Sequence, residues 1–413
     1  MSSLSRRAHE LLDAPALAGY LLEHFGRVGE AWDASTRPDG YIALCVAENK
    51  LLAEDLAALL AGYARNVPAT VLGYDAMIGN LGFREALAGF MGRAFLGRTI
   101  EAGQLAVVAG AGAVLELLFY ALADDGDGVL VPTPSYAGFW PDLQLRDRLR
   151  IVPVHCSSAT GFTLTTADLD AAMDGAEVPV KALLFTTPNN PTGRVYSREE
   201  LLEILAWGER RGLHVVFDEI YALSVFGERP FVSAASLRPV LGERAHIVWA
   251  FSKDFGASGL RCGVLFSENA EVLRAVDQLA YWAACSGHTQ HLLAQLVADT
   301  DSVDPWIDRM RAGLREACAH VMTRLDALGI PYLPAEAGFF VVCDLRGFLA
   351  APTWDAEHAL WRRLVDEANV NLTPGGACRI VEPGFFRLCY AAVPADAIDV
   401  AFDRIGAMLH RTG

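Results

Sequence analysis

Positive charge is scarce in this sequence. Its 34 lysines and arginines are outnumbered by 50 aspartates and glutamates, which leaves a formal net charge of -16 at pH 7. Nucleic acids and anionic membrane surfaces would repel such a chain, so neither is expected as a partner. The sequence also lacks an apolar run of membrane-spanning length and has no apolar signal-peptide core in residues 1–10. The sequence therefore predicts neither a membrane-spanning segment nor a secretory signal peptide.

Cysteine pairs are also missing. The eight cysteines are scattered along the chain without a C-x-x-C motif, which fits reduced thiols in a cytoplasmic protein better than a disulfide framework. Cys285, His288 and His291 are spaced three residues apart, but no second cluster would complete four ligands. No metal site is therefore expected.

The pattern of apolar runs predicts an α/β protein. The chain has 413 residues, of which 53% are hydrophobic and 20% charged, and this length suits a large domain plus a smaller one. From residue 105 onward, short apolar runs alternate with helical patterns, which indicates a mostly parallel, mixed sheet flanked by helices. The predicted strands are 105–108, 129–131, 151–154, 182–185, 214–217, 247–250 and 262–266.

Three parts of the chain are expected. Residues 1–60 form an N-terminal segment that packs with the small domain, 61–300 the large domain, and 301–413 a smaller α/β domain. A long helix that begins at Pro305 and ends at Gly329 would connect the two domains. The small domain should contain strands at 339–343, 371–373 and 385–390, a helix at 357–368 and a terminal helix.

The ends of the predicted strands carry chemically active side chains. Ligands of open parallel sheets bind beyond the carboxyl ends of the strands. After strand 105–108, Ala111, Gly112 and Ala113 lie at the start of a helix, where small residues and free N–H groups favour a phosphate. The segment matches neither a dinucleotide fingerprint nor a P-loop, and close packing of helix on strand would also explain its small residues.

Further side chains follow the next strands. Tyr136 would place a ring over the same crevice, although a core tyrosine is the ordinary alternative, and Asn190 would bring an amide. Asp218 and Tyr221 follow strand 214–217. A buried Asp218 requires a cationic partner, and a protonated pyridine nitrogen would be one.

A lysine and two arginines complete this set. Lys253, preceded by Ser252, stands where a buried strand ends, and an imine with an aldehyde cofactor would relieve the cost of burying its charge. Arg261 can bind a phosphate through two N–H groups. Arg387 lies within an apolar run, where either a substrate carboxylate or an internal acidic residue would pair with it. Together these groups are those that a pyridoxal phosphate site requires.

In this order, the residues resemble the fold-type-I pyridoxal phosphate enzymes of the class I/II aminotransferase superfamily. The resemblance runs from Tyr41 to the C-terminal helix and is strongest to the 1-aminocyclopropane-1-carboxylate synthases, which act on S-adenosylmethionine. It rests on segments 47–49, 122–124, 131–134, 152–156, 252–254, 289–293, 372–375 and 382–387. It implies a fold-type-I transferase fold, pyridoxal 5'-phosphate as cofactor, and a homodimer with shared active sites.

The resemblance also implies roles for individual residues. Lys253 would bind the cofactor and then remove the substrate α-proton, while Asp218 would keep the ring nitrogen protonated. Arg387 would bind the substrate α-carboxylate. The ring and its phosphate would be held by Ala111, Gly112, Ala113, Tyr136, Asn190, Tyr221, Ser252 and Arg261.

Three further positions bear on the substrate. Glu48 matches the acidic residue that faces the sulfonium in the synthases. Met77 stands where the synthases carry a tyrosine, whereas Tyr74 has the spacing of a tyrosine that reaches the neighbouring subunit's site in many aminotransferases.

The resemblance also departs from the family in the phosphate cup, where Gly112 and Ala113 replace hydroxyl residues of the relatives.

The leading hypothesis is an enzyme that abstracts the α-proton of S-adenosylmethionine and expels methylthioadenosine from Cγ, with ring closure or γ-replacement by a second nucleophile. The alternative is an aminotransferase that exchanges an amino group between an amino acid and a 2-oxo acid. A third hypothesis, a regulator that binds the cofactor without catalysis, is disfavoured because Lys253 and Arg387 are both present.

Overall fold

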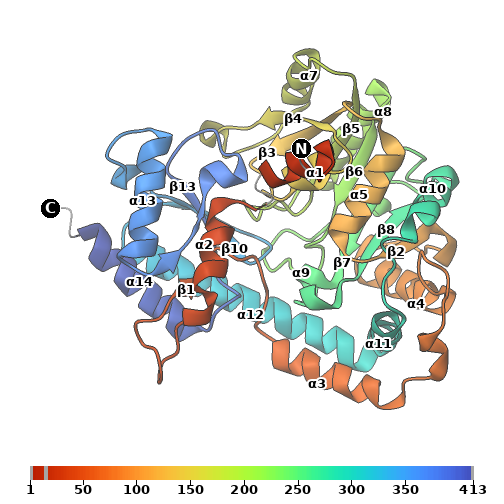
Figure 1. Ribbon diagram of the computed structural model, residues 1–413, viewed down its shortest axis with the longest axis horizontal. Helices are drawn as coiled ribbons and strands as arrows, with labels where there is room; N and C mark the ends of the chain where they lie inside the picture. Colours follow the sequence, from red (N-terminus) through yellow and green to blue (C-terminus); the bar gives the residue numbers. More distant parts are fainter. Residues whose placement is uncertain (1–2, 14–16, 411–413) are drawn as a thin grey trace.

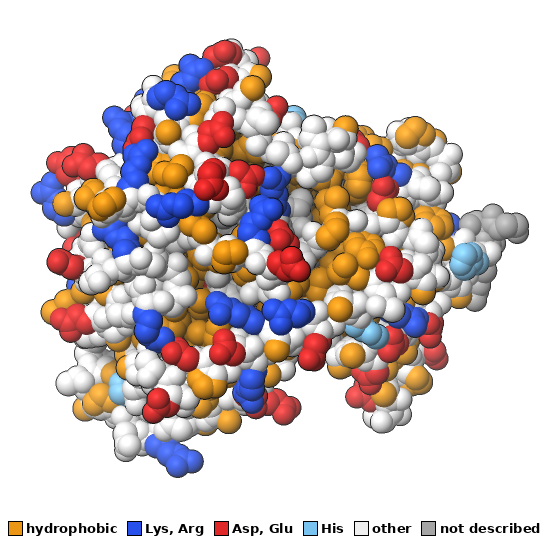
Figure 2. Space-filling view, turned by 180° about the vertical axis from the view of Figure 1, so that it is seen from behind, with side chains coloured by type: hydrophobic (Ala, Val, Ile, Leu, Met, Phe, Trp, Pro, Cys, Tyr) orange, Lys and Arg blue, Asp and Glu red, His pale blue; other side chains and the backbone are white. Residues whose placement is uncertain are grey.

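The computed structural model describes residues 3–13 and 17–410. Two lobes are visible in Figure 1, each built around a β-sheet, and the long helix α12 (Thr300–Ala327) runs from one lobe to the other. Across the face in Figure 2, acidic and basic side chains alternate, while apolar side chains gather where the lobes meet. No helix in the described part of the chain is long and apolar enough to cross a membrane.

The large lobe contains a seven-stranded mixed sheet in the order β2-β8-β7-β6-β5-β3-β4. All neighbouring strands are parallel except β8, which runs antiparallel to both β2 and β7. All seven predicted strands are present, which confirms the α/β prediction. Their bounds are β2 Leu105–Val108, β3 Gly128–Thr133, β4 Arg150–His155, β5 Val180–Thr186, β6 His214–Asp218, β7 Ala245–Ala250 and β8 Gly263–Ser267.

Apolar residues on both faces explain why this sheet lies between helices. In β7, Val248 packs in one hydrophobic cluster while Ile247 and Trp249 pack in another. Such alternation buries successive side chains on opposite faces of the sheet. One face is covered by α5 (Ala111–Leu122) and α10 (Ala270–Ala280), and residues of α8 (Arg198–Arg211) and α12 join the opposite cluster.

The small lobe has a four-stranded antiparallel sheet in the order β12-β13-β10-β9. Its strands are β9 Tyr332–Leu333, β10 Phe340–Asp344, β12 Thr373–Pro374 and β13 Phe385–Cys389, and its helices are α13 Trp354–Asp366 and α14 Ala395–His410. The predicted strand 371–373 is divided between β11 (Val370–Asn371) and β12. Since β11 pairs in parallel with β1 (Ile42–Ala43), the N-terminal segment is tied to this lobe.

The predicted start of the long helix at Pro305 is wrong by five residues. Helix α12 begins at Thr300, because the Asp299 side chain caps it by accepting from Ser302 N at 3.2 Å. Pro305 therefore lies inside the helix, where it removes one backbone donor. Burial of Val303 and Trp306 on either side of the proline helps to offset this loss.

The other helices are arranged around the two sheets (Figure 1). A short helix that follows β7 carries the lysine predicted to be catalytic, and α3 and α11 pack beside α12 in the large lobe. The bounds of the remaining α-helices are α1 Arg6–Asp13, α2 Gly19–Arg27, α3 Ala53–Tyr63, α4 Leu81–Met91, α6 Phe139–Gln144, α7 Thr166–Asp174, α9 Phe251–Asp254 and α11 Gly287–Ala298.

Candidate active site

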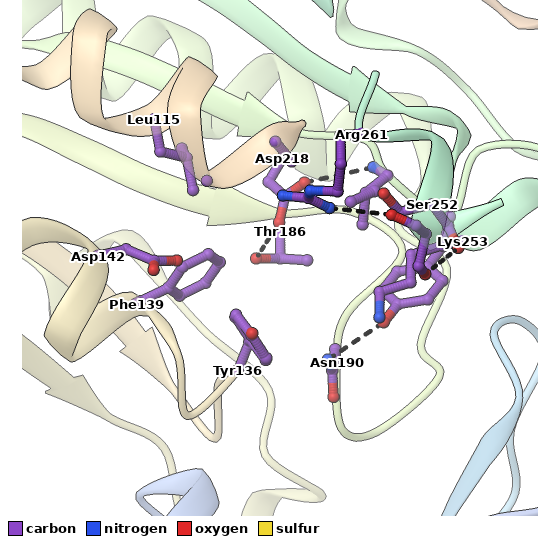
Figure 3. A pocket seen from close by; sticks show the side chains of 15 residues that line it. Leu115, Tyr136, Phe139, Asp142, Thr186, Asn190, Asp218, Ser252, Lys253 and Arg261 are labelled. Carbon is purple, nitrogen blue, oxygen red and sulfur yellow. Dashed lines mark hydrogen bonds between the residues drawn. The ribbon is translucent and has the colours of Figure 1, made fainter. Parts of the chain in front are cut away.

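A cavity of about 350 Å³ lies beyond the carboxyl ends of the parallel strands of the large sheet. The first turn of α5, the segments that follow β3, β5 and β6, and the turn at α9 all contribute to its wall (Figure 3). Of the ten residues predicted to bind a cofactor, nine line this cavity: Ala111, Gly112, Tyr136, Asn190, Asp218, Tyr221, Ser252, Lys253 and Arg261. The tenth, Ala113, packs against the apolar cluster beneath α5.

A buried carboxylate holds the turn that carries Lys253. The neighbouring Asp254 accepts hydrogen bonds from Trp249 Nε1 at 2.8 Å, Ser224 Oγ at 2.6 Å and Leu223 N at 3.0 Å. Three donors on one buried carboxylate fix the direction of α9 as it leaves β7. Gly256 at the end of this turn has φ +61°, and a Cβ there would lie 2.1 Å from Asn49 O. Only glycine therefore lets the segment before α3 approach.

That approach gives the Lys253 amine a backbone partner. Lys253 Nζ donates to Ala47 O at 2.7 Å. Burial, and then the positive charge of Arg387, lowers the pKa of Lys253 to about 8. An amine with this pKa is neutral in an appreciable fraction of molecules near neutral pH. It can thus act as a nucleophile toward an aldehyde and as a proton acceptor.

Asp218 is a buried carboxylate without an ion-pair partner among the described residues. It accepts from Ile220 N at 3.3 Å and from Thr186 Oγ1 at 3.5 Å. Burial is the main cause that raises the pKa of Asp218 to about 7, so its charged form is poorly compensated. A ligand with a protonated ring nitrogen would supply the missing cation.

Arg261 and the start of α5 form an anion site at the other side of the cavity. The guanidinium donates to Ala109 O at 3.2 Å and to Ser258 O at 3.1 Å, with no acidic partner in the described part of the chain. Gly110 has φ +97°, and a Cβ there would be 2.6 Å from Arg261 Nη2. Glycine is thus needed for the guanidinium to lie against the helix start, where free N–H groups favour a phosphate.

Asn190 links the cavity to Arg387. Asn190 Nδ2 donates to the hydroxyl of Tyr221 at 3.3 Å, and its Oδ1 accepts from Arg387 Nη1 at 3.1 Å. Burial raises the pKa of Tyr221, which keeps the phenol protonated. Tyr221 is therefore available as a hydrogen-bond donor to an oxygen on a bound ring. Tyr136 lies across the cavity from Arg261 in Figure 3.

Arg387, in β13, is only 2% exposed. Besides Asn190, its guanidinium donates to Cys45 O at 3.0 Å and Thr373 Oγ1 at 3.1 Å, while Nε has no partner. Within residues 3–13 and 17–410, no acidic side chain pairs with it. The internal Asp or Glu considered from the sequence is therefore not found. A buried guanidinium with only neutral acceptors is suited to an incoming carboxylate.

Three predicted substrate residues lie away from this cavity. Glu48 forms an ion pair with Lys50 at 3.0 Å and lines a separate pocket of about 180 Å³ beside the N-terminal segment. Tyr74 is 98% exposed, and Met77 packs against the cluster beneath α5. A single chain thus does not bring Glu48, Tyr74 or Met77 into the cavity wall.

Six other residues line the cavity without having been identified from the sequence. Thr186 is the last residue of β5, and Ser258 lies in the loop between Lys253 and Arg261. These positions in the sequence were enough to identify both as candidate site residues. The remaining ones follow from tertiary packing alone. They are Leu115, Phe139, Asp142 and Ile220. No group of three or more His, Cys, Asp or Glu side chains that could hold a metal occurs within the described residues.

Comparison with known proteins identifies the family and the fold of the chain. Residues 40–405 match the family model described as aminotransferase class I and II. The fold is shared with an aspartate aminotransferase mutant from Thermus thermophilus (TM-score 0.81, 23% identity, 99% of this chain and 100% of that chain). It is also shared with an aromatic aminotransferase from Pyrococcus horikoshii OT3 (TM-score 0.80, 24% identity, 90% and 96%). The chain belongs to the class I and II aminotransferase family and has the fold-type-I architecture.

Within this superfamily, the chain is close to the 1-aminocyclopropane-1-carboxylate synthases. It is 36% identical to synthase 4 of Oryza sativa subsp. japonica, over 92% of this chain and 84% of the relative. It is 35% identical to synthase 6 of Arabidopsis thaliana, over 89% and 78%. The protein is a pyridoxal 5'-phosphate-dependent enzyme. The unpaired Asp218, the cup around Arg261 and the neutralisable Lys253 fit the nitrogen, phosphate and aldehyde of this cofactor.

Proposed function

We propose that this enzyme acts on S-adenosylmethionine, removes its α-proton and releases methylthioadenosine from Cγ. The observation that carries the proposal is Arg387, a buried guanidinium with no carboxylate partner among the described residues, next to a cavity that contains a neutralisable amine. Together they suit an α-amino acid. The choice of S-adenosylmethionine rests on the similarity to the synthases over most of the chain.

The chain's own residues would divide the work as follows. Arg387 binds the substrate carboxylate and orients Cα, and Lys253 Nζ accepts the Cα proton. The cofactor, when bound, withdraws the electrons left on Cα. The bond between Cγ and the sulfonium sulfur then breaks, and its electron pair leaves with methylthioadenosine. In ring closure, the electron pair on Cα forms the Cα–Cγ bond that completes a cyclopropane ring. In γ-replacement, a second nucleophile forms the new bond to Cγ and Lys253 Nζ returns the proton to Cα.

Glu48 supports a cationic substrate. Lys253 Nζ donates a hydrogen bond to the carbonyl oxygen of Ala47, and Glu48 is the next residue in the chain. The backbone of Glu48 therefore lies close to the catalytic amine. The carboxylate now pairs with the exposed Lys50, an interaction that costs little to break. The sulfonium of the substrate would replace the Lys50 ammonium as the partner of the Glu48 carboxylate.

The test is mass spectrometry of the products formed from S-adenosylmethionine, with Lys253→Ala as the control for enzymatic release. Methylthioadenosine together with a cyclopropane amino acid would indicate ring closure, and methylthioadenosine with a substituted amino acid would indicate γ-replacement. No methylthioadenosine above the Lys253→Ala level, with or without added nucleophiles, would contradict the proposal.

An aminotransferase is the second candidate, since the fold is that of aminotransferases and Arg387 also suits their substrates. It predicts that an amino acid alone converts the bound cofactor to its amine form, and that a 2-oxo acid converts it back. Absorption spectra after each addition would show both changes. Unchanged spectra with a panel of amino acids would reject this candidate.

We also infer that the enzyme is a homodimer whose sites are shared. Leu72, Tyr74, Tyr281 and Trp282 are large apolar side chains exposed to solvent in one chain. The segment of the last two reaches the cofactor cup, because Ala109 N donates to the carbonyl oxygen of the adjacent residue 283 at 2.7 Å. A second copy that covers these side chains would lie beside the phosphate end of the cavity.

We also propose that the enzyme is cytoplasmic, and its eight free cysteines agree with this location.

A further inference from the structure

A second carboxylate lines the cofactor cavity. Asp142, in α6, contributes to the wall together with Asp218. Figure 3 shows Asp142 and Leu115 on one side of Asp218 and Lys253 on the other. The Asp142 side chain forms no hydrogen bond or ion pair with another described residue. The nearby Arg146 is instead paired with Glu116 at 2.8 Å.

The charge of Asp142 acts on the residues that surround the ring site. Its negative charge disfavours ionisation of both Asp218 and Tyr136. Burial, and then the charge of Glu116, raises the pKa of Asp142 to about 6, so the carboxyl group is mostly ionised above neutral pH. Neither carboxylate forms an ion pair with another described residue, and two carboxylates that repel each other in one cavity favour the binding of a cation.

We propose that Asp142 acts with Asp218 as a second anion at the nitrogen end of the cofactor site and stabilises the protonated ring nitrogen. Asp218 is the direct partner of that nitrogen, and Asp142 adds to the negative potential around it. The inference depends on the cofactor and on the cavity, and not on the identity of the amino acid substrate.

The test compares two cofactors that differ at one atom. Pyridoxal 5'-phosphate and its 1-deaza analogue, with carbon in place of the ring nitrogen, are titrated into cofactor-free protein at pH 7.5. Asp142→Asn removes the charge with little change in shape. Asp147→Asn is the matched control, because Asp147 is also a buried carboxyl near Glu116 without a partner on Oδ2 but does not line the cavity.

Asp142→Asn is expected to weaken the binding of pyridoxal 5'-phosphate by on the order of fivefold to tenfold. Binding of the deaza analogue should be unchanged, and Asp147→Asn should leave the ratio of the two affinities at its wild-type value. Asp142→Ser, which also lacks the charge, should repeat the change in ratio. Equal weakening of both cofactors, or no change for either, would overturn the proposal. Because no amino acid substrate is used, the result is independent of the S-adenosylmethionine experiment.

Discussion

Arg387 and Lys253 come from different lobes, yet the charge of Arg387 affects the pKa of Lys253. Burial is the main cause of the lowered pKa of Lys253, and the Arg387 guanidinium is the second. Arg387 remains charged, since guanidinium does not lose its proton in proteins. A bound substrate carboxylate would partly neutralise Arg387 and so raise the proton affinity of Lys253 Nζ. Substrate binding would thus make Lys253 Nζ a stronger base for the proposed removal of the α-proton.

The role of Arg387 can be tested by its conservative replacement. Arg387→Lys keeps the charge but loses the two parallel N–H donors, so affinity for an α-amino acid should fall by about 2 kcal/mol, roughly thirtyfold. Spectral titration with L-methionine measures this loss. The decarboxylated analogue, 3-methylthiopropylamine, is the control and should bind both proteins alike. An equal loss for both ligands would assign Arg387 a structural role only.

At the scale of elements, the start of α5 is arranged around one backbone conformation. Gly110 has φ +97° and ψ 167°, a region open essentially to glycine alone. This conformation ends β2 abruptly, directs the first N–H groups of α5 into the cavity and leaves space for Arg261. The site therefore has backbone donors where the relatives are expected to use hydroxyl groups at positions 112 and 113.

Gly110→Ala should destabilise the protein by about 1–3 kcal/mol and weaken cofactor binding, since the methyl group would meet the Arg261 guanidinium. Gly89→Ala is the matched control, because a Cβ at that helical position in α4 meets no atom within 4 Å and Gly89 does not line the cavity. Urea denaturation of cofactor-free protein and cofactor titration measure the two effects. Similar behaviour of both variants would contradict the assigned role of Gly110.

A histidine pair, in which His246 is buried and His214 is half-buried, joins β6, β7 and β8 far from the cavity. His246 Nε2 lies 3.0 Å from His214 Nδ1, and His246 Nδ1 lies 2.9 Å from Ser267 Oγ. Burial, and then the neighbouring His214, lowers the pKa of His246 to about 3. Since the unfolded chain binds a proton near pH 6.5, this residue stabilises the fold above that pH, and the contribution is lost progressively as the pH falls toward 3.

Through His246, acidification from pH 7 to pH 5 should thus lower the free energy of unfolding by about 2 kcal/mol. Urea denaturation at both pH values gives the loss of unfolding free energy between pH 7 and pH 5 for the wild type and for His246→Gln. The difference between these two losses is the contribution of His246. The glutamine variant should lose less stability on acidification. A parallel loss in the two proteins would show that His246 is protonated in the folded state.

At the scale of the whole molecule, the cavity wall comes from the large lobe, and Arg387 of the small lobe hydrogen-bonds to Asn190 in that wall. Tyr74 is the sequence-predicted candidate for a residue from a second subunit, and its exposure in one chain agrees with that role. Such an arrangement makes activity depend on assembly, which hybrid dimers can reveal.

Lys253→Ala and Tyr74→Ala subunits should complement each other when they are co-expressed. In random mixing half of the dimers are hybrids, and one of the two sites in each hybrid contains both intact residues, so about a quarter of wild-type activity should return. Each variant alone is the control. Activity of the mixture no greater than the sum of the separate variants would place Tyr74 outside the shared site.

Much of the cofactor site followed from the order of residues along the chain. Lys253, Asp218 and Arg261 each follow or precede a strongly apolar strand, and parallel strands bring such ends to one edge. Local pattern was enough because the strands are short, buried and separated by well-patterned helices. The same local logic failed at Pro305, where the Asp299 cap began the helix earlier.

Only the tertiary structure decided which side chains are left without partners. That Arg387 pairs with no acidic side chain in the described part of the chain and that Asp142 faces the cavity depend on contacts between segments far apart in the sequence. Sequence determined the residue types and the strands that carry them, because hydrophobic periodicity and chain order are local properties. The free energy of a buried charge depends on everything packed around it, and that is a property of the folded molecule.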